Sequence, residues 1–162
     1  MPRLATVIAS VGGIGYAPVA PGTVMSAVAM FPALILATHH GDAALFVGAA
    51  IVFAIGVWAC DAHLRATGRD DPSECVIDEL AGQFLACAFA LPSFGLLPAP
   101  QEGLYYFIAA FVLFRLFDIW KPWPVRWADR CLKGGFGVMA DDMLAGLMAG
   151  LCVLALRFMV PL

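Results

Sequence analysis

The sequence has few charged residues. Lys, Arg, Asp and Glu make up only 13% of its 162 residues, whereas 62% are hydrophobic, and the mean hydropathy is +0.90. A soluble domain is usually about 25% charged and about 45–50% apolar. One small core cannot bury this excess of apolar side chains. The composition therefore predicts a single domain, residues 1–162, whose surface contacts lipid.

Basic runs and paired cysteines are also absent. The net charge is −3, and there is no basic or acidic tail, so we expect no nucleic-acid partner. The three histidines are too scattered to predict a zinc site. The five cysteines lack CxxC spacing and are predicted to be free thiols. They are Cys60, Cys75, Cys87, Cys131 and Cys152.

Long apolar segments alternate with short polar or Pro- and Gly-containing ones. They predict an all-α, polytopic membrane protein with about five hydrophobic helices, at residues 24–38, 43–60, 75–97, 103–120 and 141–160. Several segments lie near the lower limit of about 17–25 residues that a membrane span requires. Four spans plus an interfacial helix, formed by residues 4–17, is therefore an alternative.

Basic residues predict the orientation of these spans, because cytoplasmic loops are enriched in Lys and Arg. In a five-span topology only Arg157 lies near the external side. The N-terminus is then cytoplasmic and the C-terminus external, and most acidic residues also fall near the cytoplasmic face. The basic residues on that face are Arg3, Arg65, Arg69, Lys121, Arg126, Arg130 and Lys133. Three tryptophans, Trp120, Trp123 and Trp127, are predicted interfacial anchors.

Two acid pairs precede glycines at the same spacing. Asp78 stands four residues before Gly82, and Asp142 stands four residues before Gly146, so each acid shares a helix face with its glycine. The glycines would let two helices approach closely. A simpler alternative is that the acids only begin helices, where the helix dipole favours negative charge.

Carboxylates without accompanying His or Cys ligands suit Mg²⁺, a hard cation that takes oxygen ligands. We expect the metal ligands to be Asp78, Glu79, Asp141 and Asp142, with Asp118 as a further candidate. Mg²⁺ held by such ligands often also binds a substrate phosphate. A site of this kind is expected to contain basic side chains that bind the same phosphate.

Arg115 and Lys121 are the predicted phosphate-binding cations, since an Arg side chain offers a bidentate fork. The alternative for Arg115 is an ion pair with Asp118, three residues later on the same helix face. Thr23 and Ser26 follow a Pro-Gly turn. They either contact phosphate at a helix N-terminus or only cap that helix. Residues 134–137, GGFG, predict a flexible turn.

Four pieces of sequence carry a resemblance to a known family. They are PGT at 21–23 with Ser26, DPSE at 71–74 followed by VIDE and Gly82, FRLFDIWKPWPVRWADR at 114–130, and GGFGVMADDMLAG at 134–146. Together they extend over roughly residues 13–150, and the last two pieces are highly specific. The chain resembles bacterial phosphatidylglycerophosphatase A proteins. It departs from them at Met25, where they often have glycine and where a side chain would crowd an approaching phosphate.

The resemblance implies a predominantly helical, Mg²⁺-dependent phosphatase of the bacterial inner membrane. It would remove the terminal phosphate of phosphatidylglycerophosphate in the bilayer, giving phosphatidylglycerol, at a site that faces the cytoplasm. We expect catalytic roles for Asp118, Arg115, Lys121 and Asp142, and substrate contacts from Thr23, Ser26, Arg115 and Lys121. Attack by water and a covalent aspartyl-phosphate both remain open, and the oligomeric state is not predicted.

Two other functions are compatible with a polar cluster in an apolar chain. An ion-coupled transporter would place its acids near the middle of the bilayer, whereas here they fall at span ends on one side. A structural membrane subunit would use the acids only as helix-start residues. Neutral substitution of the acids would then reduce stability without removing an activity.

Overall fold

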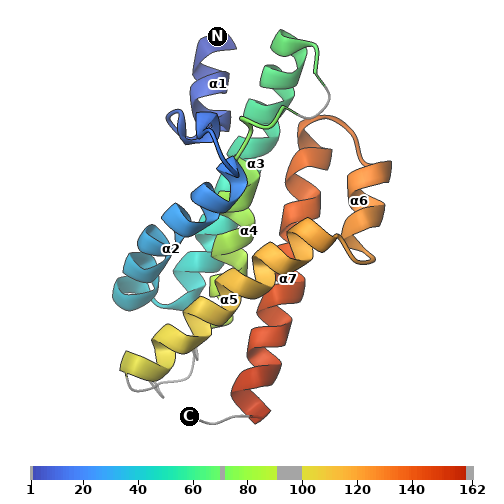
Figure 1. Ribbon diagram of the computed structural model, residues 1–162. Coiled ribbons are helices and arrows are strands. Elements are labelled where there is room, and N and C mark those ends of the chain that lie inside the picture. Colours follow the sequence, from blue (N-terminus) through green and yellow to red (C-terminus); the bar gives the residue numbers. More distant parts are fainter. Residues whose placement is uncertain (1, 70–71, 91–99, 160–162) are drawn as a thin grey trace.

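The computed structural model describes residues 2–69, 72–90 and 100–159, and these residues form helices without any strand. The elements are α1 (Pro2–Ala9), η1 (Ile14–Tyr16), α2 (Pro21–His40), α3 (Asp42–Thr67), α4 (Ile77–Cys87), α5 (Pro100–Trp120), α6 (Val125–Cys131) and α7 (Gly134–Met159). Figure 1 shows a bundle in which α4 lies among the long helices, while α1 and α6 lie toward one end.

Four helices, α2, α3, α5 and α7, are long and apolar enough to cross a membrane. Large apolar side chains remain exposed along them, including Phe31 on α2, Ile51 on α3, Val112 on α5 and Leu151 on α7. Contiguous exposure of this kind indicates contact with lipid rather than water. The predicted fold class, an all-α polytopic membrane protein, is confirmed.

The predicted third span, 75–97, is only partly present as a helix. The eleven residues of α4 extend about 16 Å, which is short of the roughly 30 Å of hydrocarbon. Residues 91–99 lie outside the described part of the chain.

The direction of α4 nevertheless agrees with a five-span topology. Beyond its C-terminal end, the carbonyl of Phe89 accepts a hydrogen bond of 3.1 Å from Nη1 of Arg157, near the end of α7. The Arg157 guanidinium also lies over the ring of Tyr106, in the first half of α5. The end of α4 and the first half of α5 therefore both lie beside the end of α7, so α4 runs from the cavity end of the bundle toward the opposite end.

Helices α3 and α7 extend furthest beyond their predicted limits. Helix α3 continues to Thr67, and α7 already begins at Gly134, so the predicted flexible turn at 134–137 is wrong. A Cβ on Gly135 would lie 2.1 Å from the carbonyl oxygen of Val57, so glycine lets α7 start directly against α3. The Gly135 N–H donates to Oδ1 of Asp61 at 3.0 Å, which satisfies one free donor at the start of α7.

Helices α4 and α7 cross where two glycines meet. A Cβ on Gly146 would lie 2.3 Å from the carbonyl oxygen of Gly82, and one on Gly82 would lie 2.7 Å from that of Asp142. The predicted close approach is therefore confirmed, and any larger residue at either position would separate the helices. Because Asp78 and Asp142 stand one turn before these glycines, the crossing brings the two acids to the same depth.

Candidate active site

A polar cavity of about 770 Å³ opens at the end of the bundle where α2, α4 and α7 begin and α3 and α5 end. All of the predicted site residues except Ser26 line it. These are Thr23, Asp78, Glu79, Arg115, Asp118, Lys121, Asp141 and Asp142. Residues from four helices, and from both halves of the chain, thus meet in one cavity.

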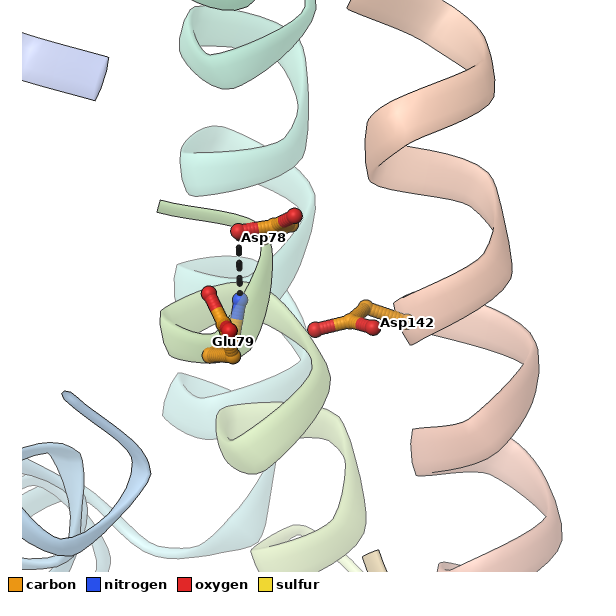
Figure 2. A group of neighbouring side chains, drawn as sticks. All are labelled: Asp78, Glu79 and Asp142. Carbon is orange, nitrogen blue, oxygen red and sulfur yellow. Dashed lines mark hydrogen bonds between the residues drawn. The ribbon is translucent and has the colours of Figure 1, made fainter. Parts of the chain in front are cut away.

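Three carboxylates converge within this cavity. Ligand oxygens of Asp78, Glu79 and Asp142 lie within 4.8 Å of one another, and Figure 2 shows the two α4 side chains beside Asp142 of α7. The Glu79 N–H donates to Oδ1 of Asp78 at 3.1 Å. Oε2 of Glu79 and Oδ2 of Asp142 are buried and have no hydrogen-bond partner among the described residues. Unpaired buried carboxylate oxygens are costly, so this donor set fits a hard cation such as Mg²⁺.

Asp141 stands apart from that group, because it pairs with Lys121. The Lys121 ammonium donates to Oδ2 of Asp141 at 2.8 Å and also pairs with Asp129 of α6. Burial lowers the pKa of Lys121, but the hydrogen bonds to Asp129 and Asp141 outweigh it and raise this pKa above its ordinary value. Lys121 is therefore a fixed positive charge on the cavity wall.

The two acid pairs occupy different places in their helices. Asp78 and Glu79 lie in the first turn of α4, where the helix dipole favours them. Asp141 and Asp142 lie about two turns inside α7, beyond the reach of that effect. The simpler explanation, acids that only begin helices, therefore holds for the first pair alone.

Arg115 makes one contact that the sequence suggested, with Asp118, and one that it did not, with Ser26. Its Nη1 lies 2.7 Å from Oδ2 of Asp118, the predicted ion pair, and donates to Oγ of Ser26 at 3.3 Å. Its Nε is buried, and within the part of the chain that the structure describes it has no hydrogen-bond partner. Both contacts hold the same nitrogen, Nη1, while the Nε donor remains free for an anion.

Thr23 and Ser26 do not cap α2, so that prediction is wrong. The helix begins at Pro21, and its cap residue, Ala20, makes no side-chain hydrogen bond. The Ser26 hydroxyl is fully buried and donates to the carbonyl of Gly22 at 2.9 Å, so Ser26 reaches the cavity only through Arg115. Met25 is also buried, in the hydrophobic core, and therefore does not crowd the cavity.

Further charged residues line the cavity that sequence reasoning used only for topology or left aside. They are Asp61, Arg65, Arg69, Asp129 and Lys133. The closeness of Arg65 and Arg69 in sequence, at the end of α3, was a signal that could have placed both at one rim. Arg65 pairs with Asp61 at 2.5 Å, and Arg69 pairs with Glu74.

A buried polar chain fixes the segment that leads into α4. Nε2 of His63 lies 3.3 Å from Oε1 of Glu74, and Nδ1 of His63 lies 2.9 Å from the hydroxyl of Thr6. Burial raises the pKa of Glu74, but its own backbone N–H, His63 and Arg69 together lower it below the ordinary value. A charged Glu74 therefore holds α1 and α3 against the approach to Asp78 and Glu79.

Comparison with known proteins agrees with this geometry. A model of the family described as Phosphatidylglycerophosphatase A matches residues 7–157. The chain belongs to the phosphatidylglycerophosphatase A family. Its enzyme class is accordingly that of phosphatases, the phosphoric monoester hydrolases. Every polar residue that lines the cavity falls within the matched range.

Three curated relatives cover most of the chain. The phosphatidylglycerophosphatase A of Escherichia coli K12 is 34% identical over 85% of this chain and 74% of its own length. That of Haemophilus influenzae is 35% identical over 90% and 84%. A Bacteroides thetaiotaomicron protein, named as a candidate phosphatidylinositol-3-phosphatase, is 36% identical over 91% and 90%. No solved structure matches the chain.

Proposed function

We propose that this protein is a Mg²⁺-dependent phosphatase that removes the terminal phosphate of phosphatidylglycerophosphate, giving phosphatidylglycerol in phospholipid biosynthesis. The observation that carries the proposal is the meeting of Asp78, Glu79 and Asp142 in a cavity whose wall also holds Arg115 and Lys121. The printed names of the E. coli and H. influenzae relatives support the choice of lipid.

Asp78, Glu79 and Asp142 would hold the metal ion, since two of their buried oxygens have no partner among residues 2–69, 72–90 and 100–159. When bound, Mg²⁺ supplies a Lewis acid that offsets the charge of phosphate oxygens and lowers the pKa of water. Asp141 would stay paired with Lys121 and so act on the position of that cation. This assignment narrows the four ligands expected from sequence to three, with Asp141 at their edge.

The remaining charged groups would bind and orient the phosphate. Arg115 offers its free Nε, and Asp118 and Ser26 keep the guanidinium from turning away. Lys121 adds a second positive charge where negative charge develops in the transition state. Asp118 is the cavity carboxylate beside Arg115 that lies outside the group of three, so we assign it to accept a proton from the attacking water.

Attack by a carboxylate, with a phosphorylated aspartate as intermediate, is the alternative route. Asp118 would then be the residue that carries the phosphoryl group. Acid quenching during turnover of radiolabelled substrate separates the two routes. If label is bound to the wild-type protein but not to Asp118→Asn, the reaction proceeds through phosphorylated Asp118 and not by direct attack of water on the lipid phosphate.

We also propose that the site faces the cytoplasm of a bacterial inner membrane. Basic residues gather at the cavity end of the bundle, and Trp120, Trp123 and Trp127 are exposed there, as expected at a membrane interface. Cys131 is exposed on α6 at this end. A membrane-impermeant maleimide should leave Cys131 unmodified in intact spheroplasts and modify it after permeabilisation. Modification in intact spheroplasts would reverse the orientation.

The deciding experiment measures phosphate release from purified protein in detergent with phosphatidylglycerophosphate, phosphatidic acid and phosphatidylinositol 3-phosphate. The third lipid is included because one relative carries that name. We expect release from phosphatidylglycerophosphate with Mg²⁺ and none after chelation. Release from another lipid alone, or release that survives chelation, would contradict the proposal.

A further inference from the structure

A narrow apolar groove lies on the membrane-facing side of the helix pair α2 and α5. It encloses about 210 Å³ and is lined by Ala27 and Met30 of α2 and by Ile108 and Phe111 of α5. Ala27 and Ile108 are exposed, so the groove is open to the surroundings of the bundle. Because both helices are candidate membrane spans, those surroundings are hydrocarbon.

The groove adjoins the phosphate-binding side of the cavity. Ala27 directly follows Ser26, and Phe111 stands one turn before Arg115, so the contact between Ser26 and Arg115 separates the groove from the cavity. Thr23 and Arg115, which line the cavity, belong to the same two helices. A molecule that lies along α2 and α5 can therefore place a polar end in the cavity and an apolar end in the groove.

We propose that the groove binds one acyl chain of the lipid phosphomonoester whose phosphate enters the cavity. This inference rests on the proposed function. Its basis is the position of an apolar groove next to a cationic cavity on the same two helices, which matches a ligand that has an acyl chain next to a phosphate. Anchoring of the chain between α2 and α5 would orient the headgroup toward Arg115, so part of the affinity comes from a region remote from the reacting phosphorus.

The test compares dioleoyl with dibutyryl phosphatidylglycerophosphate in mixed micelles at fixed detergent ratio. Ala27→Trp and Ile108→Trp fill the groove from opposite walls. We expect kcat/KM for the dioleoyl lipid to fall at least about tenfold, the equivalent of two methylene groups that lose their burial. The value for the dibutyryl lipid should change little, because its chains end close to the headgroup.

Val28→Trp and Val112→Trp are matched controls on exposed positions of the same two helices, outside the groove. They should leave the ratio of the two kcat/KM values at the wild-type level. Equal effects of groove and control variants would overturn the proposal. So would a change of oligomeric state confined to the groove variants, measured by light scattering, which would make the groove a contact between copies of the chain.

Using both walls keeps the test valid if one variant fails to fold, which thermal unfolding in detergent would reveal. Wild-type protein that releases phosphate from neither lipid would refute the proposed function itself, and the acyl-chain site with it. If wild-type protein is active and both groove variants keep the same chain-length preference, the acyl-chain site alone is refuted.

Discussion

Oε1 of Glu79 occupies the place where a side chain on Gly22 would have to be. A Cβ built on Gly22 would lie 1.9 Å from this oxygen and 3.5 Å from Nη1 of Arg115. The start of α2 thus approaches a candidate metal ligand and a candidate phosphate ligand at once. Residue 22 of the PGT segment is therefore a glycine because a side chain there would collide with Glu79, and not because the backbone needs an unusual conformation.

Gly22→Ala should therefore displace the Glu79 carboxylate. We expect a higher Mg²⁺ concentration for half-maximal phosphate release and a fall in kcat/KM of about 10–100-fold, as is typical when the shell around a metal is disturbed. Gly48→Ala is the control, since its Cβ would meet the apolar side chains of Phe84, at 3.2 Å, and Leu36, at 3.8 Å. An unchanged Mg²⁺ requirement in Gly22→Ala would show that Glu79 is not a ligand.

Asp142→Asn should abolish phosphate release while the protein stays folded. The substitution removes charge from the group of three carboxylates but keeps the shape of the side chain. Since like charges meet there, we expect thermal stability without metal to stay equal or rise. Asp42→Asn, at the opposite end of the bundle, should retain activity. Near-normal turnover by Asp142→Asn would remove this residue from the site.

Arg115→Lys should lower kcat/KM by roughly 100-fold, although the positive charge remains. All three N–H groups of a lysine ammonium are on one nitrogen, so a lysine that contacts Ser26 and Asp118 has no second nitrogen to present to the phosphate, as the planar fork of arginine has. Arg130→Lys on α6, which is exposed and lies outside the cavity, serves as the control. Equal activity of the two variants would mean that only charge at position 115 matters.

Glu74 should stabilise the fold in a pH-dependent way. Its folded-state pKa is lowered, so its contribution is present above the unfolded pKa of about 4.3 and is lost as the pH falls through the folded value. The difference in unfolding free energy between wild type and Glu74→Gln should therefore shrink on acidification. A difference that grows at low pH, in denaturant titrations of detergent-solubilised protein, would contradict this sign.

Much of the fold followed from hydrophobicity. Apolar segments of the sequence predicted the four long helices, and the glycines at positions 82 and 146 predicted that α4 and α7 approach closely. Helix limits were harder to predict. The start of α7 at Gly134 depends on packing of Gly135 against α3 and on a hydrogen bond from Asp61, a residue more than seventy positions away. No local pattern could reveal such a contact.

The sequence predicted which residues belong to the candidate site better than it predicted which of them contact each other. Residue type and spacing brought eight residues together that indeed line one cavity. Sequence spacing could not show that Asp141 pairs with Lys121 and so lies outside the group formed by Asp78, Glu79 and Asp142, because that pairing depends on the turn between α5 and α6. The buried chain from Thr6 through His63 to Glu74 was missed for the same reason, since its members come from three separate segments.

The crossing at Gly82 and Gly146 has a consequence for ion selectivity. The contact joins main chain to main chain, so the separation of Asp78 from Asp142 is fixed one turn away by atoms that no rotamer change can move. Ca²⁺ needs oxygen ligands about 0.3 Å farther away than Mg²⁺ does, and more of them. Asp78 and Asp142, attached to a rigid helix crossing, cannot easily move apart to make room for the larger ion. The site should therefore bind Mg²⁺ more tightly than Ca²⁺.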